Sequence, residues 1–360
     1  FFIFAINSKY CCLIQFHSLK VAKIKEETIN SVSIIFDVPK FLQENYSFKA
    51  GQYVTLKAKI KGNLIFRSYS ICSSPNSGLL KIGVKAVSNG LFSNYANTAL
   101  REGDHLEVST PKGRFVVENA YRKNTFFAIA AGSGITPVIS ILKNVLLSNK
   151  ESQFVLLYGN RSIKETMFFD EIEGLKISFA GRFFCYNIYS AENNPNSEYG
   201  RIDFGFINFC LKKHDNLKFD KIFICAPEGL TESVSNNLED LGYKKENILY
   251  ELFYSNTNKK SKINEAKGAV QANITCDFEE FTITVPQNMT LLDAALNQNI
   301  DVPYSCQGGV CSTCIGKITS GSAKMIENNI LTDLEIQDGL ILACQAIPTS
   351  RSISIDFDDV

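Results

Sequence analysis

Four cysteines in the C-terminal part of this 360-residue chain limit its possible folds more than any other feature. They are Cys306, Cys311, Cys314 and Cys344. The first three fall within nine residues, and 29 residues separate the third from the fourth. Thiolates are the ligands that soft metal ions prefer, and three of them on one short stretch must point at one centre. The chain around them must therefore wrap closely around a compact metal site.

The spacing of these cysteines distinguishes between metals. Cys-x4-Cys-x2-Cys followed by a distant cysteine is the arrangement of plant-type [2Fe–2S] clusters, which need four thiolates. Zinc is the alternative, but zinc sites favour paired Cys-x2-Cys knuckles, which the isolated Cys344 fits less well. A second alternative is four cysteines that only pack in a core. We expect the cluster, because nearby glycines let the backbone approach the sulfurs. These glycines are Gly308, Gly309 and Gly316.

The other seven cysteines are scattered along the chain. They are Cys11, Cys12, Cys72, Cys185, Cys210, Cys225 and Cys276. Eleven cysteines in all are far too few for a disulfide scaffold of this length. Scattered thiols and one tight group suit a reducing compartment, so we expect the cytoplasm. No run of eighteen apolar residues offers a membrane span, and we expect neither a membrane nor a nucleic acid as partner. Residues 1–15 make a poor signal peptide and are interpreted as an extension before a domain that begins near Phe16.

The pattern of apolar residues divides the chain into segments. Residues 16–120 carry short β-rich runs separated by turn signals, which predicts a sandwich or barrel. Residues 121–254 alternate apolar runs with helical stretches, which predicts βαβ units around a parallel sheet. Residues 255–268 are polar and lysine-rich and are interpreted as a linker. Residues 269–360 are expected to begin with a hairpin and continue with a short helix before they reach the cysteines.

Individual elements can be assigned within these segments. The expected strands of the first segment are Val32–Val38, Tyr53–Ala58, Leu79–Val84 and His105–Ser109, with a turn at Lys61–Asn63 and Arg67 at the start of a further strand. The expected helices of the second are Thr136–Leu147, Lys164–Glu173 and Leu230–Leu241. In the third we expect a hairpin of Val270–Cys276 with Phe281–Val285 and a helix over Thr290–Asn297.

The formal net charge of zero hides an asymmetry. From Ala269 onward there are 3 basic and 12 acidic residues, against 34 basic and 25 acidic residues before it. Oppositely charged parts are expected to dock on each other or on a charged partner, or to carry their charge for solubility alone.

A glycine-containing turn, Gly132-Ser133-Gly134-Ile135-Thr136-Pro137, follows an apolar strand and opens a helix. Small residues let the backbone approach a pyrophosphate, and the N-terminus of a helix favours its negative charge. Pro137 replaces the third glycine of a Gly-x-Gly-x-x-Gly motif and suits the first helical turn. Alone, such a turn is often a mere connection, so it indicates a phosphate site only together with other motifs.

Further motifs accompany this turn. In chain order they are Arg67-Ser68-Tyr69-Ser70, Val84-Lys85, Gly90-Leu91-Phe92-Ser93, the glycine turn, Tyr158-Gly159-Asn160-Arg161, Cys225-Ala226-Pro227-Glu228-Gly229 and Glu251-Leu252-Phe253. In this order they resemble the ferredoxin–NADP reductase superfamily over about residues 16–254. Pro303–Cys314 and Ala343–Ala346 resemble the ferredoxin family over 269–360. The implied architecture is multidomain: an N-terminal antiparallel β-barrel for FAD, an α/β domain with a parallel sheet for NAD(P)H, and a C-terminal β-grasp ferredoxin domain.

The first resemblance implies roles at an FAD site. Arg67 would pair with the flavin pyrophosphate, which suits a guanidinium. Tyr69 would stack on the flavin, and Ser70 would form a hydrogen bond near its N5 atom. Other residues implied in cofactor binding around it are Val84, Lys85, Gly90, Ser93 and Phe253. Taken singly, Arg67 could equally form a surface ion pair and Tyr69 could pack in a core.

The same resemblance implies a nicotinamide site. Its residues would be Gly132, Ser133, Gly134, Thr136, Gly159, Asn160, Arg161, Ser190, Cys225 and Pro227. The implied catalytic residues are Ser70, Cys225 and Glu251. The nucleotide is NADPH or NADH. Arg161, Lys164 and Ser190 could bind a 2′-phosphate and favour NADPH, whereas relatives that use NADPH place an arginine where Ala191 stands.

The order of the three parts resembles the reductase components of bacterial multicomponent oxygenases, and within them those of phenylacetyl-CoA epoxygenases. The resemblance implies an NAD(P)H-dependent oxidoreductase that passes electrons from NAD(P)H through FAD and [2Fe–2S] to a partner oxygenase. A reductase for a hybrid-cluster protein or a desaturase is the alternative with the same electron path. A redox sensor that binds flavin without turnover is an alternative of another class.

Overall fold

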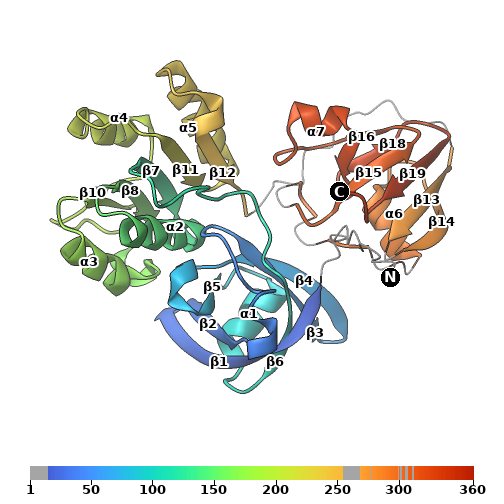
Figure 1. The fold of residues 1–360 in the computed structure, drawn as a ribbon, viewed down its shortest axis with the longest axis horizontal. Coiled ribbons are helices and arrows are strands. Elements are labelled where there is room, and N and C mark those ends of the chain that lie inside the picture. The colour runs from blue at the N-terminus through green and yellow to red at the C-terminus, as the bar shows by residue number, and fades with distance from the viewer. Residues whose placement is uncertain are drawn as a thin grey trace, which may run out of the picture. The chain divides into compact units, whose positions relative to one another are not determined.

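The computed structural model describes residues 15–253 and 268–360, except residues 277, 299, 301, 305, 306, 310 and 311 and the side chain of Asn63. The chain forms two compact units, Phe16–Tyr254 and one that contains Ser255–Val360, which are treated separately below (Figure 1). Among the helices of the described ranges, none has the length and apolar character needed to cross a membrane.

Six antiparallel strands form the first sheet of the larger unit, in the order β4-β3-β6-β1-β2-β5. They are β1 (Phe16–Thr28), β2 (Ser31–Asp37), β3 (Tyr53–Ile60), β4 (Asn63–Ser70), β5 (Leu80–Lys85) and β6 (His105–Ser109). The sheet closes because Ile71, directly after β4, pairs with Ile82 of β5, and the Cys72 amide donates to the Lys81 carbonyl. Helix α1 (Leu91–Thr98) packs Phe92 into the enclosed core. The expected antiparallel barrel is therefore confirmed.

The hairpin of β3 and β4 corrects one detail of the sequence prediction. Its turn consists of Lys61 and Gly62 alone, with φ of 51° and 84°, the left-handed conformations of a two-residue hairpin turn. Strand β4 therefore begins at Asn63. Arg67 lies in the second half of the strand, opposite Leu56, and its expected place at the start of a strand is wrong.

The second sheet of the larger unit is parallel throughout, with the order β10-β9-β8-β7-β11-β12. Its strands are β7 (Thr125–Ala131), β8 (Gln153–Asn160), β9 (Phe183–Tyr189), β10 (Glu198–Tyr199), β11 (Lys221–Cys225) and β12 (Ile248–Glu251). Phe126 and Ala128 pack on the side of α2 (Ile135–Ser148) and α3 (Phe169–Ser178). Phe127 and Ile129 pack on the side of α4 (Phe204–Lys213) and α5 (Glu228–Asp240).

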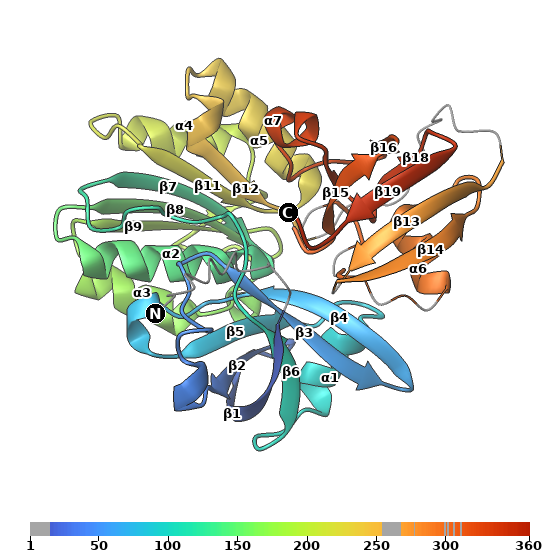
Figure 2. The same ribbon diagram turned by 45° about the vertical axis from the view of Figure 1, so that its right-hand side comes forward.

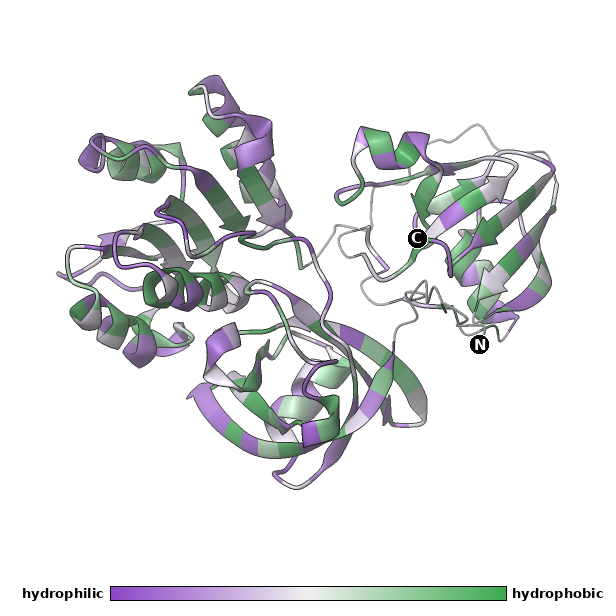
Figure 3. Ribbon diagram, in the orientation of Figure 1, coloured by the Kyte–Doolittle hydropathy of each residue, from purple (hydrophilic) through white to green (hydrophobic). Residues whose placement is uncertain are grey.

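The hydropathy of the two sheets differs as their burial requires. In Figure 3 purple and green bands alternate along the barrel strands, whereas the inner strands of the parallel sheet are green. A strand covered by helices on both faces is apolar throughout, and a barrel strand is apolar on its inner face alone.

One expected helix is displaced. A helix was predicted over Lys164–Glu173, but the structure has a short 3₁₀ turn at Ile163–Glu165 and begins α3 only at Phe169. The Thr166 hydroxyl donates to the Ser162 carbonyl at 2.8 Å, and Phe168 has a left-handed φ of 59°. That conformation interrupts a helix, so the prediction is wrong in position.

The smaller unit contains a five-stranded mixed sheet in the order β14-β13-β19-β15-β17. Its strands are β13 (Val270–Cys276), β14 (Glu279–Val285), β15 (Ile315–Ser320), β17 (Leu340–Leu342) and β19 (Ser352–Asp356). Strands β16 (Ala323–Met325) and β18 (Ala346–Pro348) form a separate pair, and the helices are α6 (Leu291–Asn297) and α7 (Asp333–Gln337). Figure 2 shows this unit from the side of β13, β14 and α6.

The predicted hairpin and helix of the smaller unit are confirmed. Strands β13 and β14 pair antiparallel from Val270 opposite Val285 to Cys276 opposite Glu279. Helix α6 starts directly after Thr290, whose hydroxyl accepts a hydrogen bond from the Asp293 amide at 3.1 Å. A small mixed sheet with one helix packed on it is the expected β-grasp fold.

Candidate functional site

The three residues expected to be catalytic meet where the barrel contacts the parallel sheet. Ser70 ends β4, and Cys225 and Glu251 end the neighbouring strands β11 and β12, where they stand opposite each other. The Ser70 hydroxyl donates a hydrogen bond to Glu251 Oε2 at 3.2 Å, across 181 residues of sequence. The fold therefore builds this group from both sheets of the larger unit.

Burial sets the protonation of this group. The Glu251 carboxyl is surrounded by protein, which raises its pKa to about 8 against the opposing effect of the Ser70 hydrogen bond. Burial also raises the pKa of the Cys225 thiol well above its usual value, and the nearby Glu251 carboxyl adds to this effect. Near neutral pH both side chains are therefore protonated and neutral.

The residues expected at the flavin gather around the end of β4 and the start of α1. Arg67 and Tyr69 alternate with the strand period and so share one face of β4. The Tyr69 ring lies 5.4 Å from the Phe92 ring, centroid to centroid. The Arg67 guanidinium donates to the carbonyl of Phe66, its neighbour in sequence, at 2.7 Å.

The start of α1 fits a phosphate group. No side chain caps this eight-residue helix at its N-cap residue Gly90. A β-carbon at Gly90 would collide with the Ser93 hydroxyl and lie 2.5 Å from a methyl group of Val87. The Ser93 hydroxyl accepts a hydrogen bond from the Val87 amide at 3.2 Å. A glycine-lined helix start of this kind is a suitable place for the flavin pyrophosphate.

Val84 and Lys85, which were assigned to the cofactor as a pair, point to opposite sides of β5. The Val84 side chain is fully buried in the barrel core, so the structure does not bring it into the site. The Lys85 Nζ atom lies 3.8 Å from where a β-carbon at Gly132 would stand. Burial lowers the pKa of Lys85, and Arg161 acts in the same direction.

The glycine turn has the close packing that its sequence implies. Gly132 has a left-handed φ of 55° and begins a 3₁₀ turn that leads into α2. A β-carbon at Gly134 would collide with the carbonyl oxygen of Cys225. The Thr136 hydroxyl donates to the Ser133 carbonyl at 3.0 Å, and no side chain caps the start of α2. The turn therefore offers a helix N-terminus against the end of β11, which fits the pyrophosphate of a nicotinamide nucleotide.

The residues expected around the end of the nucleotide away from the nicotinamide, which include Gly159, Arg161 and Ser190, also come together. Ser190, just after β9, donates its backbone amide to the Asn160 carbonyl at 3.0 Å. A β-carbon at Gly159 would lie 2.9 Å from Ile202 Cδ1, which explains the glycine. The Arg161 side chain is 74 % exposed, with Nε 3.6 Å from Glu165 Oε1.

Two more of the expected residues lie beside Cys225. Pro227 is the residue that precedes α5. Phe253 packs against the core cluster that contains Cys225.

The sequence interpretation missed two acidic neighbours of the far end of the nucleotide site. Glu165 forms the ion pair with Arg161, and Glu192 Oε2 accepts a hydrogen bond from the Ile163 amide at 2.9 Å. It also missed Gly83 of β5, where a β-carbon would lie 2.6 Å from Thr136 Cγ2. The alternation of Lys81, Gly83 and Lys85 along one strand face was the signal that could have identified this contact.

Two of the four expected cluster ligands lie on neighbouring strand ends of the smaller unit. Cys314 directly precedes β15, and its carbonyl accepts a hydrogen bond from the Ala343 amide at 2.9 Å. Cys344 follows β17, and both cysteines are buried, with 1 % and 5 % exposure. Cys306 and Cys311 lie outside the described residues.

The chain next to these cysteines is held in place. The Gln345 side chain donates to the Gln307 carbonyl at 3.0 Å and has its nitrogen 3.7 Å from Cys344 Sγ. Gly309 has a φ of 72°, and a β-carbon there would lie 3.0 Å from the Gln345 side chain. Two buried thiols on paired strand ends, next to a closely packed glycine loop, fit a [2Fe–2S] cluster.

Three family models match successive parts of the chain. The family model described as oxidoreductase FAD-binding domain matches residues 18–117, and the oxidoreductase NAD-binding domain matches residues 128–236. The 2Fe-2S iron-sulfur cluster binding domain matches residues 274–349. The three family matches therefore cover most of both sheets of the larger unit, without β12, and most of the smaller unit.

Two relatives match along nearly the whole chain. A 1,2-phenylacetyl-CoA epoxidase component from Escherichia coli (strain K12) is 38% identical, over 95% of this chain and 98% of the relative. The ferredoxin reductase component of 3-ketosteroid-9-alpha-monooxygenase from Rhodococcus rhodochrous is 30% identical, over 94% of this chain and 96% of the relative. Phthalate dioxygenase reductase has a similar fold, with a TM-score of 0.60 and 22% identity over 95% of this chain and 98% of that one.

Proposed function

The chain belongs to the family of FAD- and [2Fe–2S]-containing reductase components of oxygenases, and we propose that its partner is a di-iron oxygenase of the phenylacetyl-CoA epoxygenase type. As a member of this family it is an NAD(P)H-dependent oxidoreductase. When bound, FAD would supply the conversion between the two-electron hydride chemistry of a nicotinamide and the single-electron chemistry of an iron–sulfur cluster. The observation that carries the choice of partner is the 38% identity to the Escherichia coli epoxidase component, which extends over all three parts.

We propose that Ser70, Cys225 and Glu251 form the wall of the hydride-transfer site. Their contact at the junction of the two sheets supports this role. The Ser70 hydroxyl is oriented by Glu251, and the high pKa of that carboxyl lets it hold a proton near neutral pH. The neutral Cys225 thiol is buried at the end of β11 and would contribute apolar packing behind the nicotinamide ring.

The phosphate groups are assigned to the two uncapped helix starts. Gly90 and Ser93, with Arg67 on the adjacent strand, would hold the flavin pyrophosphate. Gly132 to Thr136 would hold that of the nicotinamide nucleotide. Cys306 and Cys311 would complete the ligand set that Cys314 and Cys344 begin. The scattered cysteines, which do not suit a disulfide scaffold, support a cytoplasmic location for the protein.

We propose NADPH as the preferred nucleotide. The exposed Arg161 side chain and Ser190 stand side by side at the ends of β8 and β9, where a 2′-phosphate would lie. Replacing Arg161 with alanine is expected to lower kcat/KM for NADPH by about tenfold, through the loss of one charge-assisted contact. The kcat/KM for NADH should change by less than about twofold. Steady-state kinetics with both nucleotides test this. Wild-type protein with a clearly higher kcat/KM for NADH would overturn the proposal.

The proposed partner is tested by reconstitution. We expect purified protein, NADPH and a purified di-iron phenylacetyl-CoA epoxygenase component, supplied with phenylacetyl-CoA and dioxygen, to form epoxide and water, with one NADPH oxidised for each epoxide. Omitting the reductase is the control for adventitious reduction. Efficient electron transfer only to a hybrid-cluster protein or a desaturase would contradict the proposed partner. Failure to sustain NADPH-dependent ferricyanide reduction would instead favour a redox sensor.

A further inference from the structure

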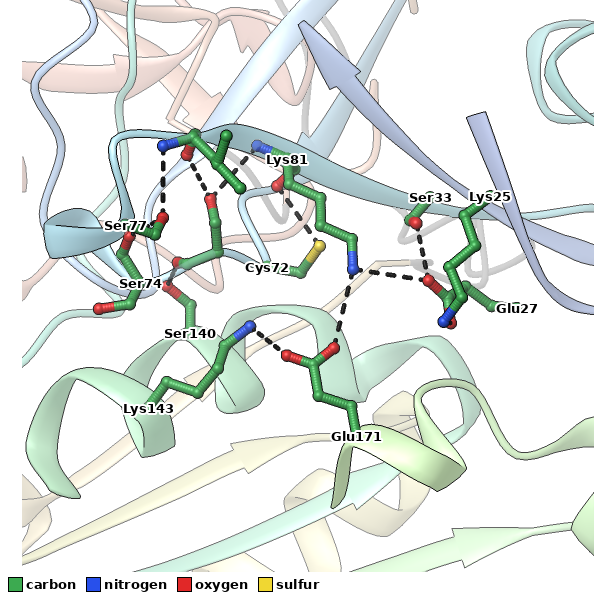
Figure 4. Close-up of polar contacts among 12 residues, drawn as sticks. Lys25, Glu27, Ser33, Cys72, Ser74, Ser77, Lys81, Ser140, Lys143 and Glu171 are labelled. Atoms are coloured by element: carbon green, nitrogen blue, oxygen red, sulfur yellow. Dashed lines mark hydrogen bonds and ion pairs between the residues drawn. The ribbon is translucent and has the colours of Figure 1, made fainter. Parts of the chain in front are cut away.

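Five charged side chains form a chain of ion pairs across the contact between the barrel and the parallel-sheet domain (Figure 4). At the barrel end, Lys25 Nζ lies 3.1 Å from Glu27 Oε2. Lys81 Nζ of β5 lies 3.5 Å from Glu27 Oε1 of β1 and 3.7 Å from Glu171 Oε2 of α3. The other oxygen of Glu171 accepts a hydrogen bond from Lys143 Nζ of α2 at 2.7 Å. The chain of ion pairs therefore runs from the barrel through Lys81 to two helices of the other domain.

These ion pairs are more sheltered than ordinary surface pairs. The side chains are 2 % exposed for Glu27, 14 % for Lys81 and Lys143, and 30 % for Glu171. Burial opposes the charge of Glu171, but Lys143 and Lys81 hold the pKa of its carboxyl below the usual value. Partly buried pairs are screened less by salt than exposed pairs, so this group can fix a geometry.

An uncharged hydrogen bond ties the same two domains beside the charges, and a second one links it to Lys81. The Ser140 hydroxyl of α2 donates to the Ser73 carbonyl of the barrel at 2.6 Å, and this contact is buried. The Ser73 hydroxyl in turn accepts a hydrogen bond from the Lys81 amide at 3.2 Å. The backbone of Lys81 and its ammonium group are thus both part of the domain contact.

One face of β5 connects this contact with the nucleotide turn. Lys81, Gly83 and Lys85 are every second residue of β5, so they lie on the same face of the strand. The strand is roughly 13 Å long between Lys81 and Lys85. Lys81 Nζ lies 4.9 Å from the centre of the Phe168 ring, and Gly83 packs against Thr136. Lys85 ends the row beside Gly132. A shift of α2 and α3 against Lys81 would therefore displace the glycine turn.

We propose that Lys81 and Glu171 are positioning residues for hydride transfer. The flavin-binding residues lie on the barrel and the glycine turn lies on the other domain, so the separation of the reactants depends on how the domains contact each other. Lys81 and Glu171 fix that contact where β5 meets α3. The proposal rests on the reductase activity and not on the identity of the oxygenase partner.

The test compares holoenzyme variants Lys81→Met and Glu171→Gln with wild type. At saturating NADPH, the single-turnover rate of flavin reduction should fall about tenfold in each, because small misplacements of reactants slow transfer. The NADPH concentration for half-saturation should change less than about twofold, since the glycine turn is continuous with α2 and would move with it, keeping its own contacts to the nucleotide. As a readout separate from activity, hydrogen exchange should increase in Leu80–Lys85. Lys81→Arg, which retains the charge, should recover most of the rate.

Lys123→Met is the matched control. Lys123 also forms an ion pair with a glutamate, Glu151 at 3.4 Å, but both side chains are about 70 % exposed and lie within one domain. This variant should match wild type in its rate of flavin reduction and in the hydrogen exchange of β5. Lys143→Met removes the other cation that pairs with Glu171. It replaces Lys81→Met in the test if that variant does not fold.

Two outcomes would overturn the proposal. The first is an unchanged rate of flavin reduction together with increased exchange in β5, because the contact would then loosen without affecting transfer. The second is a loss of rate that follows loss of bound flavin or a lower Tm, because the residues would then only stabilise the fold. A wild-type protein that NADPH cannot reduce would contradict the reductase assignment itself, and so is distinct from both.

Discussion

A Cys344→Ala variant is expected to lose its iron and to reduce cytochrome c at least about 100-fold more slowly, while ferricyanide reduction by NADPH stays within about twofold. Cys344 is buried at the end of β17, beside Cys314 and the Gln345 side chain. Removing Cys344 leaves the ligand set one thiolate short of the four that a [2Fe–2S] cluster needs. The cluster is the proposed outlet for single electrons, whereas ferricyanide can accept electrons from the flavin. Iron analysis, the absorption spectrum and the two assays measure these changes.

Cys276→Ala is the matched control for this prediction. Cys276 is another buried thiol of the same unit, with 6 % exposure at the end of β13. It should retain two irons per chain and wild-type cytochrome c reduction. Full iron content in Cys344→Ala would refute the ligand assignment. Zinc in anaerobically prepared wild-type protein would refute the cluster itself.

A Gly134→Ala variant is expected to show a fall of about 100-fold in kcat/KM for NADPH. A β-carbon at this position would collide with the Cys225 carbonyl oxygen, which is backbone and cannot rotate away. The start of α2 would have to move off the end of β11, and the nucleotide pyrophosphate would move with it. Bound flavin should be retained, since the barrel residues are not touched. Stopped-flow flavin reduction and flavin content measure the two effects.

Gly174→Ala provides the control. Gly174 lies within α3, and a β-carbon there would meet no atom within 4 Å. This variant should keep wild-type kinetics and gain about 0.5–1 kcal/mol of stability, because alanine favours a helix more than glycine does. Wild-type kinetics in Gly134→Ala would show that the turn does not hold the nucleotide.

The sequence predicted most of the fold where local patterns reflect burial. The strands of the parallel sheet are apolar throughout because helices cover both faces, and Thr125–Ala131 shows this pattern. Strand β1 was not predicted because most of its residues are at least partly exposed and so give no clear alternation. Helix α3 was misplaced because its start depends on the left-handed Phe168, which no periodic pattern reveals.

The candidate site was predictable only in part, for a related reason. The motifs identified Ser70 and Glu251 separately, but their hydrogen bond joins residues that are 181 positions apart and depends on how two domains contact each other. Lys81 escaped notice because a lysine in an alternating strand is usually exposed. Its partners Glu27, Lys143 and Glu171 come from three other elements, and nothing local links them.

The strand order of the smaller unit has a consequence for the newly made protein. Strand β19, the last along the described chain, lies between β13 and β15 in the middle of the sheet. On the ribosome the four cysteines therefore emerge before the strand that completes their domain. A nascent chain that has not reached Ser352 carries these thiols without a finished sheet to bury them. Oxidants and iron shortage should thus damage freshly translated molecules first, while molecules that have already acquired their iron are spared.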